Sequence, residues 1–244
     1  MTEELFPRAP REVAAGAVHL PGLLGEARQR ELLAACRAWA LPPAGLRTVR
    51  TRAGVMSVRQ VGLGRHWGPV PRCPACGRAR AEPGECAAHA YPYAYTRVAH
   101  DGDGAPVKAF PAWLGDWARE AVAAAARAGA TGLAAHAGAA YDTGLINFYD
   151  ARARMGMHQD ADERSPAPVV SFSLGDACVF RFGTPAGRGR PWEDVELRGG
   201  DAFVFGGPSR LAYHGVPRTR PGTAPPWLGL EGRVNVTVRV SGLA

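Results

Sequence analysis

Residues 232–242 read GRVNVTVRVSG, and this stretch decides the fold. Valines occupy every second position with polar side chains between them, which predicts a β-strand with one apolar and one polar face. Similar short runs bounded by glycine come before it, namely GLINFYD at 144–150, PVVSFSLG at 168–175, ACVFRFG at 177–183 and DVELRGGDAFVFGG at 194–207. Short strands separated by turn residues predict a β-sandwich or barrel.

The first half of the chain has a different pattern. Residues 25–39 and 112–130 carry apolar side chains at helical spacing, and the second segment is rich in alanine, so both predict helices. Patches of β-branched residues over 47–61 indicate strands. We therefore expect an α+β chain, mainly β with flanking helices, divided into an N-terminal region at 1–140 and a β core at 141–244.

The composition limits the class of protein. Of the 244 residues, 46% are apolar and 21% charged, which excludes a disordered or collagen-like chain. A net charge of +7 favours phosphate-bearing partners, although a solubility preference would explain it equally well. No apolar run reaches the roughly 18–20 residues of a membrane span, and the N-terminal residues lack a secretory signal. With an odd count of 5 cysteines, these features predict a cytoplasmic protein without membrane partners.

Two histidines and one carboxylate predict a metal site. His158 and Asp160 form an H-x-D motif at the end of an expected strand, where residues two apart point to the same face. His214 follows another expected strand far along the chain. Two histidines and one carboxylate form the facial triad of non-haem Fe(II) oxygenases. The alternative is that these histidines are structural.

The polar face of the 232–242 strand predicts an anion site. Arg233, Asn235 and Arg239 share that face, and buried guanidinium groups are costly unless an anion compensates them. A dicarboxylate would do so, because each guanidinium can hold one carboxylate through two hydrogen bonds. Asn147 and Tyr149, on one face of an earlier strand, could complete the site. The alternative is an exposed edge strand whose polar face is solvated.

The combined motifs resemble the AlkB family, whose members are Fe(II)- and 2-oxoglutarate-dependent dioxygenases that demethylate alkylated nucleobases. The resemblance rests on LINFYDARARMGMHQDADE at 145–163, PVVSFSLGDACVFRFG at 168–183, GDAFVFGGPSRLAYHGV at 200–216 and GRVNVTVR at 232–239. It implies a double-stranded β-helix (jelly-roll) core. It also implies three catalytic iron ligands, His158, Asp160 and His214. The 2-oxoglutarate contacts implied are Asn147, Tyr149, Arg233, Asn235 and Arg239.

The same resemblance implies a recognition lid over the iron. Trp67 corresponds to an aromatic side chain that stacks on the base, and Asp162 to a carboxylate that reads its exocyclic amine. Glu163 is the alternative acid, but in an extended chain the next residue points the other way. Plain packing is the alternative role for each of these residues. The substrate contacts expected are Trp67, Tyr93, Tyr95, Asp162 and Arg210.

A second metal site is expected within the lid. Residues 71–89 read PRCPACGRARAEPGECAAH, with two pairs of ligands at x-x spacing. This spacing predicts a closed, structural zinc knuckle at 71–92. The alternative is a flexible loop with free thiols, and either His66 or His100 could replace the histidine ligand. The zinc ligands expected are Cys73, Cys76, Cys86 and His89.

The resemblance to the AlkB family implies an enzyme that demethylates N-alkylated bases of the 1-methyladenine and 3-methylcytosine type in DNA, with RNA as an open alternative. Fe(II), 2-oxoglutarate and O₂ would be used, and succinate, CO₂ and formaldehyde released. We expect a monomer that prefers single strands. Two other functions stay open: a 2-oxoglutarate oxygenase of a small metabolite or protein side chain, and a non-catalytic, zinc-stabilised nucleic-acid-binding module.

Overall fold

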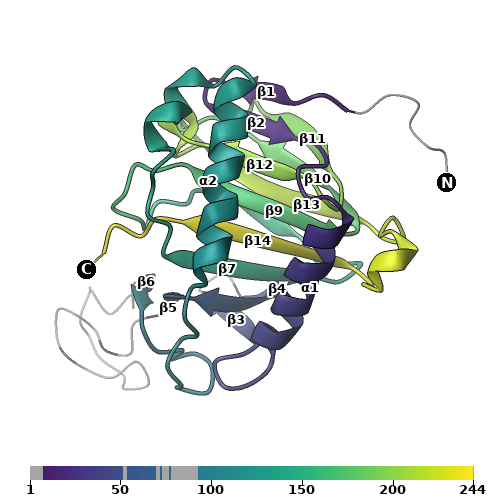
Figure 1. The fold of residues 1–244 in the computed structure, drawn as a ribbon. Helices are drawn as coiled ribbons and strands as arrows, with labels where there is room; N and C mark the ends of the chain where they lie inside the picture. The colour runs from purple at the N-terminus through teal and green to yellow at the C-terminus, as the bar shows by residue number, and fades with distance from the viewer. Residues whose placement is uncertain (1–7, 52–53, 70–71, 73–76, 78–92, 244) are drawn as a thin grey trace.

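The computed structural model describes residues 8–51, 54–69, 72, 77 and 93–243 (Figure 1). Its helices are α1 (Glu26–Ala40) and α2 (Ala112–Arg127), with short 3₁₀ turns η1 (Thr131–His136), η2 (Gly207–Ser209) and η3 (Pro226–Leu228). The strands are β1 (Arg11–Ala14), β2 (Ala17–Leu20), β3 (Arg47–Thr51), β4 (Gly54–Leu63), β5 (His66–Pro69), β6 (Tyr93–Thr96), β7 (Thr143–Tyr149), β8 (Met155–His158), β9 (Val169–Gly175), β10 (Ala177–Phe182), β11 (Glu193–Leu197), β12 (Ala202–Phe205), β13 (His214–Arg220) and β14 (Arg233–Arg239).

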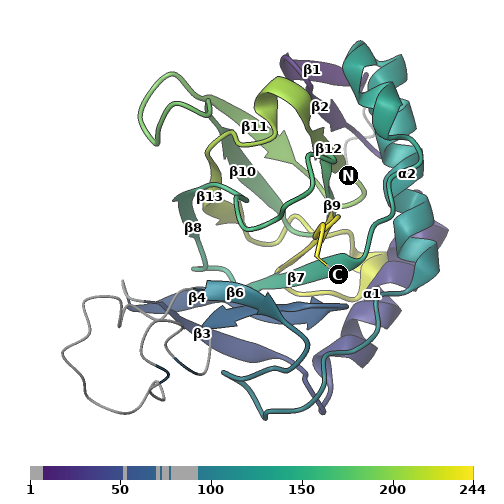
Figure 2. The ribbon, with the colours of Figure 1, turned by 90° about the vertical axis from the view of Figure 1, so that its left-hand side faces the viewer.

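Most of the strands form two antiparallel sheets. The major sheet has the order β1-β2-β12-β9-β14-β7-β4-β3, and the minor sheet has the order β11-β10-β13-β8. The minor sheet lies across one face of the major sheet (Figure 2). This is the jelly-roll expected for the β core, and its mainly β character with flanking helices is confirmed. Strands from both sides of residue 140 pair within the major sheet.

The two helices cover the other face of the major sheet (Figure 2). They bury the apolar side chains expected from their periodicity, including Leu32 on α1 and Trp117 on α2. Phe172 of β9 lies in the same cluster and is completely buried. Helix α2 is three residues shorter than expected, because the chain leaves the helix before Gly129, whose φ of 125° is not helical. None of the helices described is long and apolar enough to cross a membrane.

Strand β14 lies between β9 and β7, so the alternative of a solvated edge strand is excluded. Its valines pack in the cluster beneath the helices. Its polar residues face the minor sheet and line a cavity between the sheets. A second apolar cluster, with Phe180 and Phe203, fills the rest of the space between the two sheets. The alternation in the sequence thus separates a helix-packing face from a site face.

Candidate active site

A cavity of about 430 Å³ opens between the two sheets. Its walls combine polar side chains of β7 and β14 with methionines and aromatic side chains of the minor sheet. Trp67 and Tyr95 of the small β5–β6 sheet also line it. The residues predicted from sequence to bind iron or 2-oxoglutarate all lie on its wall: Asn147, Tyr149, His158, Asp160, His214, Arg233, Asn235 and Arg239.

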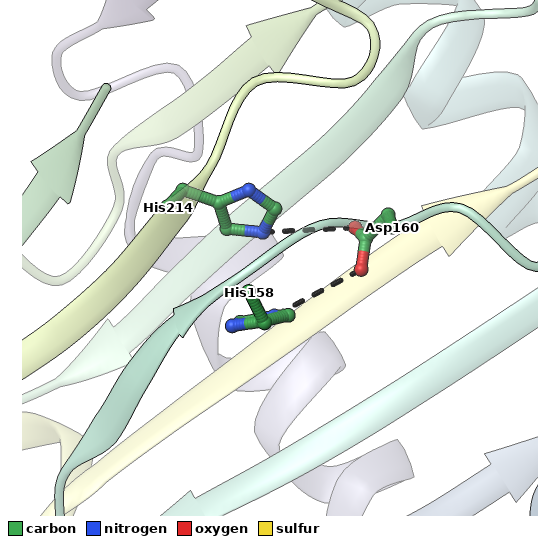
Figure 3. Close-up of side chains that lie close together, drawn as sticks. All are labelled: His158, Asp160 and His214. Atoms are coloured by element: carbon green, nitrogen blue, oxygen red, sulfur yellow. Dashed lines mark ion pairs between the residues drawn. The ribbon is translucent and has the colours of Figure 1, made fainter. Parts of the chain in front are cut away.

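The two histidines and Asp160 converge at one point of this cavity (Figure 3). His158 at the end of β8 pairs in register with His214 at the start of β13, which brings their ring centroids to 4.5 Å. Asp160 follows two residues later. Its carboxylate oxygens lie 3.9 Å from His158 Nε2 and 3.7 Å from His214 Nε2. One ligand atom from each of the three residues lies within 4.8 Å of the others.

The protonation of this cluster suits a metal ion. The Nδ1 atoms of His158 and His214 face backbone carbonyls at 2.9 and 3.0 Å, which leaves each Nε2 turned toward Asp160. Burial lowers the pKa of His214 to about 4, so its imidazole is neutral at neutral pH. Burial opposes ionisation of Asp160, but Arg239 and the two histidines hold its pKa well below the usual range. Two imidazoles and one carboxylate form a donor set that fits Fe(II).

Arg239 contacts the predicted iron ligand directly. Its Nη2 lies 2.7 Å from Asp160 Oδ1, and its Nε donates to Asp160 Oδ2 at 3.1 Å. Both side chains are buried. The resemblance assigned Arg239 to 2-oxoglutarate, and the structure places it where it orients the carboxylate of Asp160. The guanidinium compensates that charge, so a metal ion would meet a pre-positioned carboxylate.

Arg233 has no such charge partner. It is 2% exposed, and its guanidinium donates to the Ser173 hydroxyl at 3.0 Å and more weakly to the Asp176 carbonyl at 3.5 Å. Its Nε has no hydrogen-bond partner, and within the described residues no carboxylate pairs with it. A buried cation without compensation is costly, so the site fits a carboxylate of a bound dianion. Asn235 lies beside it and is held by the Ser171 hydroxyl at 2.6 Å.

Comparison with known proteins identifies the family. Residues 16–239 match the family described as the 2OG-Fe(II) oxygenase superfamily. The chain belongs to this superfamily. Its His158, Asp160 and His214 cluster could hold a metal ion such as the iron that this description names, and Arg233 is a buried cation with an unsatisfied Nε.

Named relatives narrow the likeness to the AlkB family, so the predicted resemblance is confirmed. This superfamily member is 48% identical over 99 residues to "Alpha-ketoglutarate-dependent dioxygenase AlkB homolog" of Caulobacter vibrioides, covering 40% of this chain and 44% of that protein. It is 42% identical over 102 residues to "Alpha-ketoglutarate-dependent dioxygenase AlkB" of Escherichia coli, covering 41% and 46%. The chain thus spans less than half the length of these curated relatives.

A solved structure, "The structure of OsALKBH1", is similar over nearly the whole chain. The TM-score is 0.74 with 28% sequence identity, and the match covers 95% of this chain and 99% of that one. The structural likeness therefore includes the N-terminal region.

The β5–β6 sheet of this superfamily member brings two aromatic residues to the cavity mouth. Trp67 on β5 pairs in register with Tyr95 on β6. The Trp67 indole N–H donates to Asp162 at 2.5 Å, and the Tyr95 hydroxyl donates to Glu163 at 2.5 Å. Burial raises the pKa of Asp162, against the effect of the Trp67 hydrogen bond. Trp67 and Tyr95 are thus joined by hydrogen bonds to two acids that follow Asp160 in the sequence, and all four side chains line the cavity.

The sequence argument turned Glu163 away from the site, whereas the structure places its side chain in the cavity wall. The alternation rule turned it away from the site, but residues 159–164 form no strand, so the rule does not apply there. Its side chain is 1% exposed and lines the cavity. Arg210 donates to Glu163 at 2.9 Å and to the Asp160 carbonyl at 2.7 Å. Arg210, expected near the substrate, therefore lies behind these acids and holds their loop.

Other polar groups at the site carried no motif that could have revealed them. Gln60 of β4 lines the cavity and donates to Asn147 at 2.8 Å. Ser173, the hydroxyl partner of Arg233, lies in a strand that reads as plain core. Their only signal is strand register, because Gln60 lies opposite Asn147 and Ser173 lies opposite Asn235.

Several predicted residues lie outside the part of the chain that can be described. The zinc ligands expected at Cys73, Cys76, Cys86 and His89 belong to this group, as does the side chain of Tyr93. Of the two alternative histidine ligands, His66 is buried and its Nε2 lies 2.5 Å from Asp101, while His100 is exposed.

Proposed function

We propose that this chain is an Fe(II)- and 2-oxoglutarate-dependent dioxygenase that demethylates cationic N-methylated bases of nucleic acid, with single-stranded DNA as its main substrate. One observation carries the proposal. A two-histidine, one-carboxylate cluster and the uncompensated Arg233 share one cavity, whose mouth is lined by Trp67 and Asp162. A metal site, an anion site and an aromatic–acid pair are the three components that this reaction needs.

The side chains of the cavity would have separate roles in this reaction. His158, Asp160 and His214 would hold Fe(II), and Arg233 would bind the carboxylate of 2-oxoglutarate remote from the metal. When bound, iron with 2-oxoglutarate and O₂ supplies the oxidation, in which the N-methyl carbon leaves as formaldehyde and 2-oxoglutarate becomes succinate and CO₂. Arg239 keeps Asp160 ionised and oriented. The apolar wall of the cavity limits access of water to the reacting methyl group.

The recognition residues suit a flat cation. A base methylated at adenine N1 or cytosine N3 carries positive charge, which favours an aromatic plane and a carboxylate. Trp67 offers the plane and Asp162 the carboxylate, and the two already touch through a hydrogen bond. An exocyclic amine entering here would replace the indole N–H as the donor to Asp162. The base must leave its stack to reach this depth.

An assay with methylated oligonucleotides tests the proposal. Single-stranded DNA that contains one 3-methylcytosine should yield formaldehyde and succinate in equal amounts, only when Fe(II) and 2-oxoglutarate are present. Asp160→Ala should abolish this turnover. Asp194→Ala is the matched control, because Asp194 is an exposed acid paired with Arg181 on the outer face of the minor sheet. Methylated RNA and duplex DNA in parallel measure the substrate preference.

Two results would count against the proposal. Succinate without formaldehyde from every methylated oligonucleotide would favour an oxygenase of a metabolite or protein side chain. Binding of oligonucleotides without turnover of 2-oxoglutarate would favour the non-catalytic module.

We also propose that Cys73, Cys76, Cys86 and His89 hold one structural Zn²⁺, and that the enzyme is a cytoplasmic monomer. The support for zinc is the spacing of the ligands, since thiolates select zinc while the His/carboxylate triad suits iron. Elemental analysis of the purified protein should find one equivalent of zinc, retained in Asp160→Ala and lost in Cys76→Ser. Zinc below stoichiometry with freely titratable thiols would contradict it.

A further inference from the structure

Strand β5 has a second functional face, opposite the one that carries Trp67. Neighbouring residues of a strand point to opposite sides, so Trp67 lines the active-site cavity while His66 lines another cavity behind the strand. That rear cavity has a volume of about 450 Å³. Within the described residues β5 pairs in a sheet only with β6, so the major sheet does not fix it by ladder hydrogen bonds. The cavity behind β5 leaves room on that side, so polar contacts there contribute to its position in addition to the β6 ladder.

A buried charge cluster supplies those contacts, and we call Arg47, Asp101 and His66 the rear cluster. Asp101 lies in the turn that follows β6, and its Oδ1 is 2.5 Å from His66 Nε2 and 3.1 Å from Arg47 Nε. Arg47 of β3 then donates Nη2 to the Trp67 carbonyl at 2.8 Å. Side-chain exposure is only 2% for His66 and 6% for Arg47. The cluster thus connects the major sheet, through β3, to the backbone of the residue that faces the base.

The local sequence leaves space for this cluster. A Cβ atom on Gly68 would lie 2.7 Å from His66 Nε2 and 3.4 Å from Asp101 Oδ1, so the contact between them requires a glycine there. Burial disfavours the charge of Asp101, but the hydrogen bond from His66 and the charge of Arg47 hold its pKa below the usual value. The carboxylate is therefore ionised and tied to both partners at neutral pH.

We propose that the rear cluster is a positioning device for base recognition, with Asp101 as its central residue. Asp101 belongs neither to the metal triad nor to the wall of the active-site cavity. It acts through Arg47, which holds the Trp67 carbonyl, and through His66, which precedes Trp67 on the strand. The inference rests on the proposed function in one respect, namely that Trp67 stacks on the methylated base.

Steady-state kinetics of Asp101→Asn test the proposal, because asparagine keeps the size of the side chain and removes its charge. The probe is single-stranded DNA with one 3-methylcytosine. We expect the apparent KM for this oligonucleotide to rise about tenfold, or about 1.4 kcal/mol, with kcat changed by less than about twofold. The affinity for 2-oxoglutarate should be unchanged. Arg47→Lys, which keeps the charge but removes the planar donor to Trp67, should have the same effect.

Asp103→Asn is the matched control. Asp103 lies in the same turn and also lines the rear cavity, but its carboxylate accepts hydrogen bonds from the backbone amides of Ala44 and Ala105, and among the described residues it forms no ion pair with His66 or Arg47. Its KM and kcat should stay at the wild-type values. In a Trp67→Ala background, Asp101→Asn should add less than about twofold to KM, since the residue through which it acts is gone.

Three results would overturn the proposal: a wild-type KM in Asp101→Asn, equal losses in kcat and 2-oxoglutarate affinity, or an undiminished effect in the Trp67→Ala background. A second readout does not depend on turnover. Hydrogen exchange of the Trp67 and Gly68 amides should be faster in Asp101→Asn than in Asp103→Asn, without added metal. If wild-type protein lacks demethylase activity, the proposed function fails, and this exchange measurement still decides whether the cluster holds the strand.

Discussion

Arg233 and Arg239 stand at the two ends of one strand, face the same cavity and differ in charge balance. The positive charge of Arg239 is compensated within the protein, because its guanidinium pairs with Asp160 and lies close to Glu163. Arg233 is also buried, but its partners among the described residues are neutral. Folding therefore leaves one cation uncompensated at a defined point, and the binding of a dianion would relieve that cost.

Arg233→Met separates binding from stability at this residue. Methionine keeps a long apolar side chain but removes the charge, so the affinity for 2-oxoglutarate should fall by about 10- to 100-fold, or about 1.5–3 kcal/mol. The free energy of unfolding should be unchanged or higher, because the substitution leaves no buried charge unpaired and removes only hydrogen bonds to the neutral Ser173 hydroxyl and Asp176 carbonyl. Calorimetry and denaturant unfolding measure the two quantities.

Arg239→Met is the comparison for that experiment. Its loss leaves Asp160 buried without its guanidinium, so this variant should lose stability. An unchanged 2-oxoglutarate affinity in Arg233→Met, or a stability loss as large as that of Arg239→Met, would contradict the anion site.

At the scale of elements, the sequence predicts the strands and helices in which apolar residues recur at a regular spacing. The alternation over 233–239 correctly separated the valines of β14 from its polar face, and register with β7 then brought Asn147 opposite Asn235. The helices were likewise predicted from their periodicity. The prediction for α2 ran past the end of the helix, because alanine favours helix beyond the residue where the chain turns. In each of these segments the backbone is regular, so the spacing of residues along the sequence determines which face each side chain occupies.

Elements without a period could not be predicted in this way. Glu163 lies in an irregular loop, so no rule of alternation gives its direction. The rear cluster joins residues from three separate segments, and none of the three stands in a recognisable motif. A two-residue turn after β4 directs β5 away from the major sheet, a geometry that composition does not encode. Long-range polar contacts decide these positions, and they are visible only once the chain has folded.

At the scale of the whole molecule, a single buried carboxylate joins the N-terminal segment to the jelly-roll. Asp201 precedes β12 and is fully buried. It receives two hydrogen bonds from Arg8 at 2.8 and 2.9 Å and faces His19 Nε2 at 2.9 Å. The backbone amides of Gly22 and Arg198 also donate to it, each at 2.9 Å. These side-chain contacts, which span some 190 positions of sequence, add to the β2–β12 ladder in joining the N-terminal segment to the jelly-roll.

Asp201→Asn tests the contribution of this carboxylate through pH. Burial opposes the charge of Asp201, but His19, Arg8 and the amides lower its pKa from 3.8 to about 2. A depressed carboxyl pKa stabilises the fold above the unfolded value and loses that contribution as pH falls toward the folded value. Wild type should therefore exceed Asp201→Asn in unfolding free energy by about 2 kcal/mol at pH 7. The difference should narrow between about pH 5 and pH 2, because protonation removes from wild type what the substitution has already removed from the variant. Denaturant unfolding of both proteins at pH 7 and pH 3 measures it, and a difference that stays constant would show that Asp201 acts through its shape and not its charge.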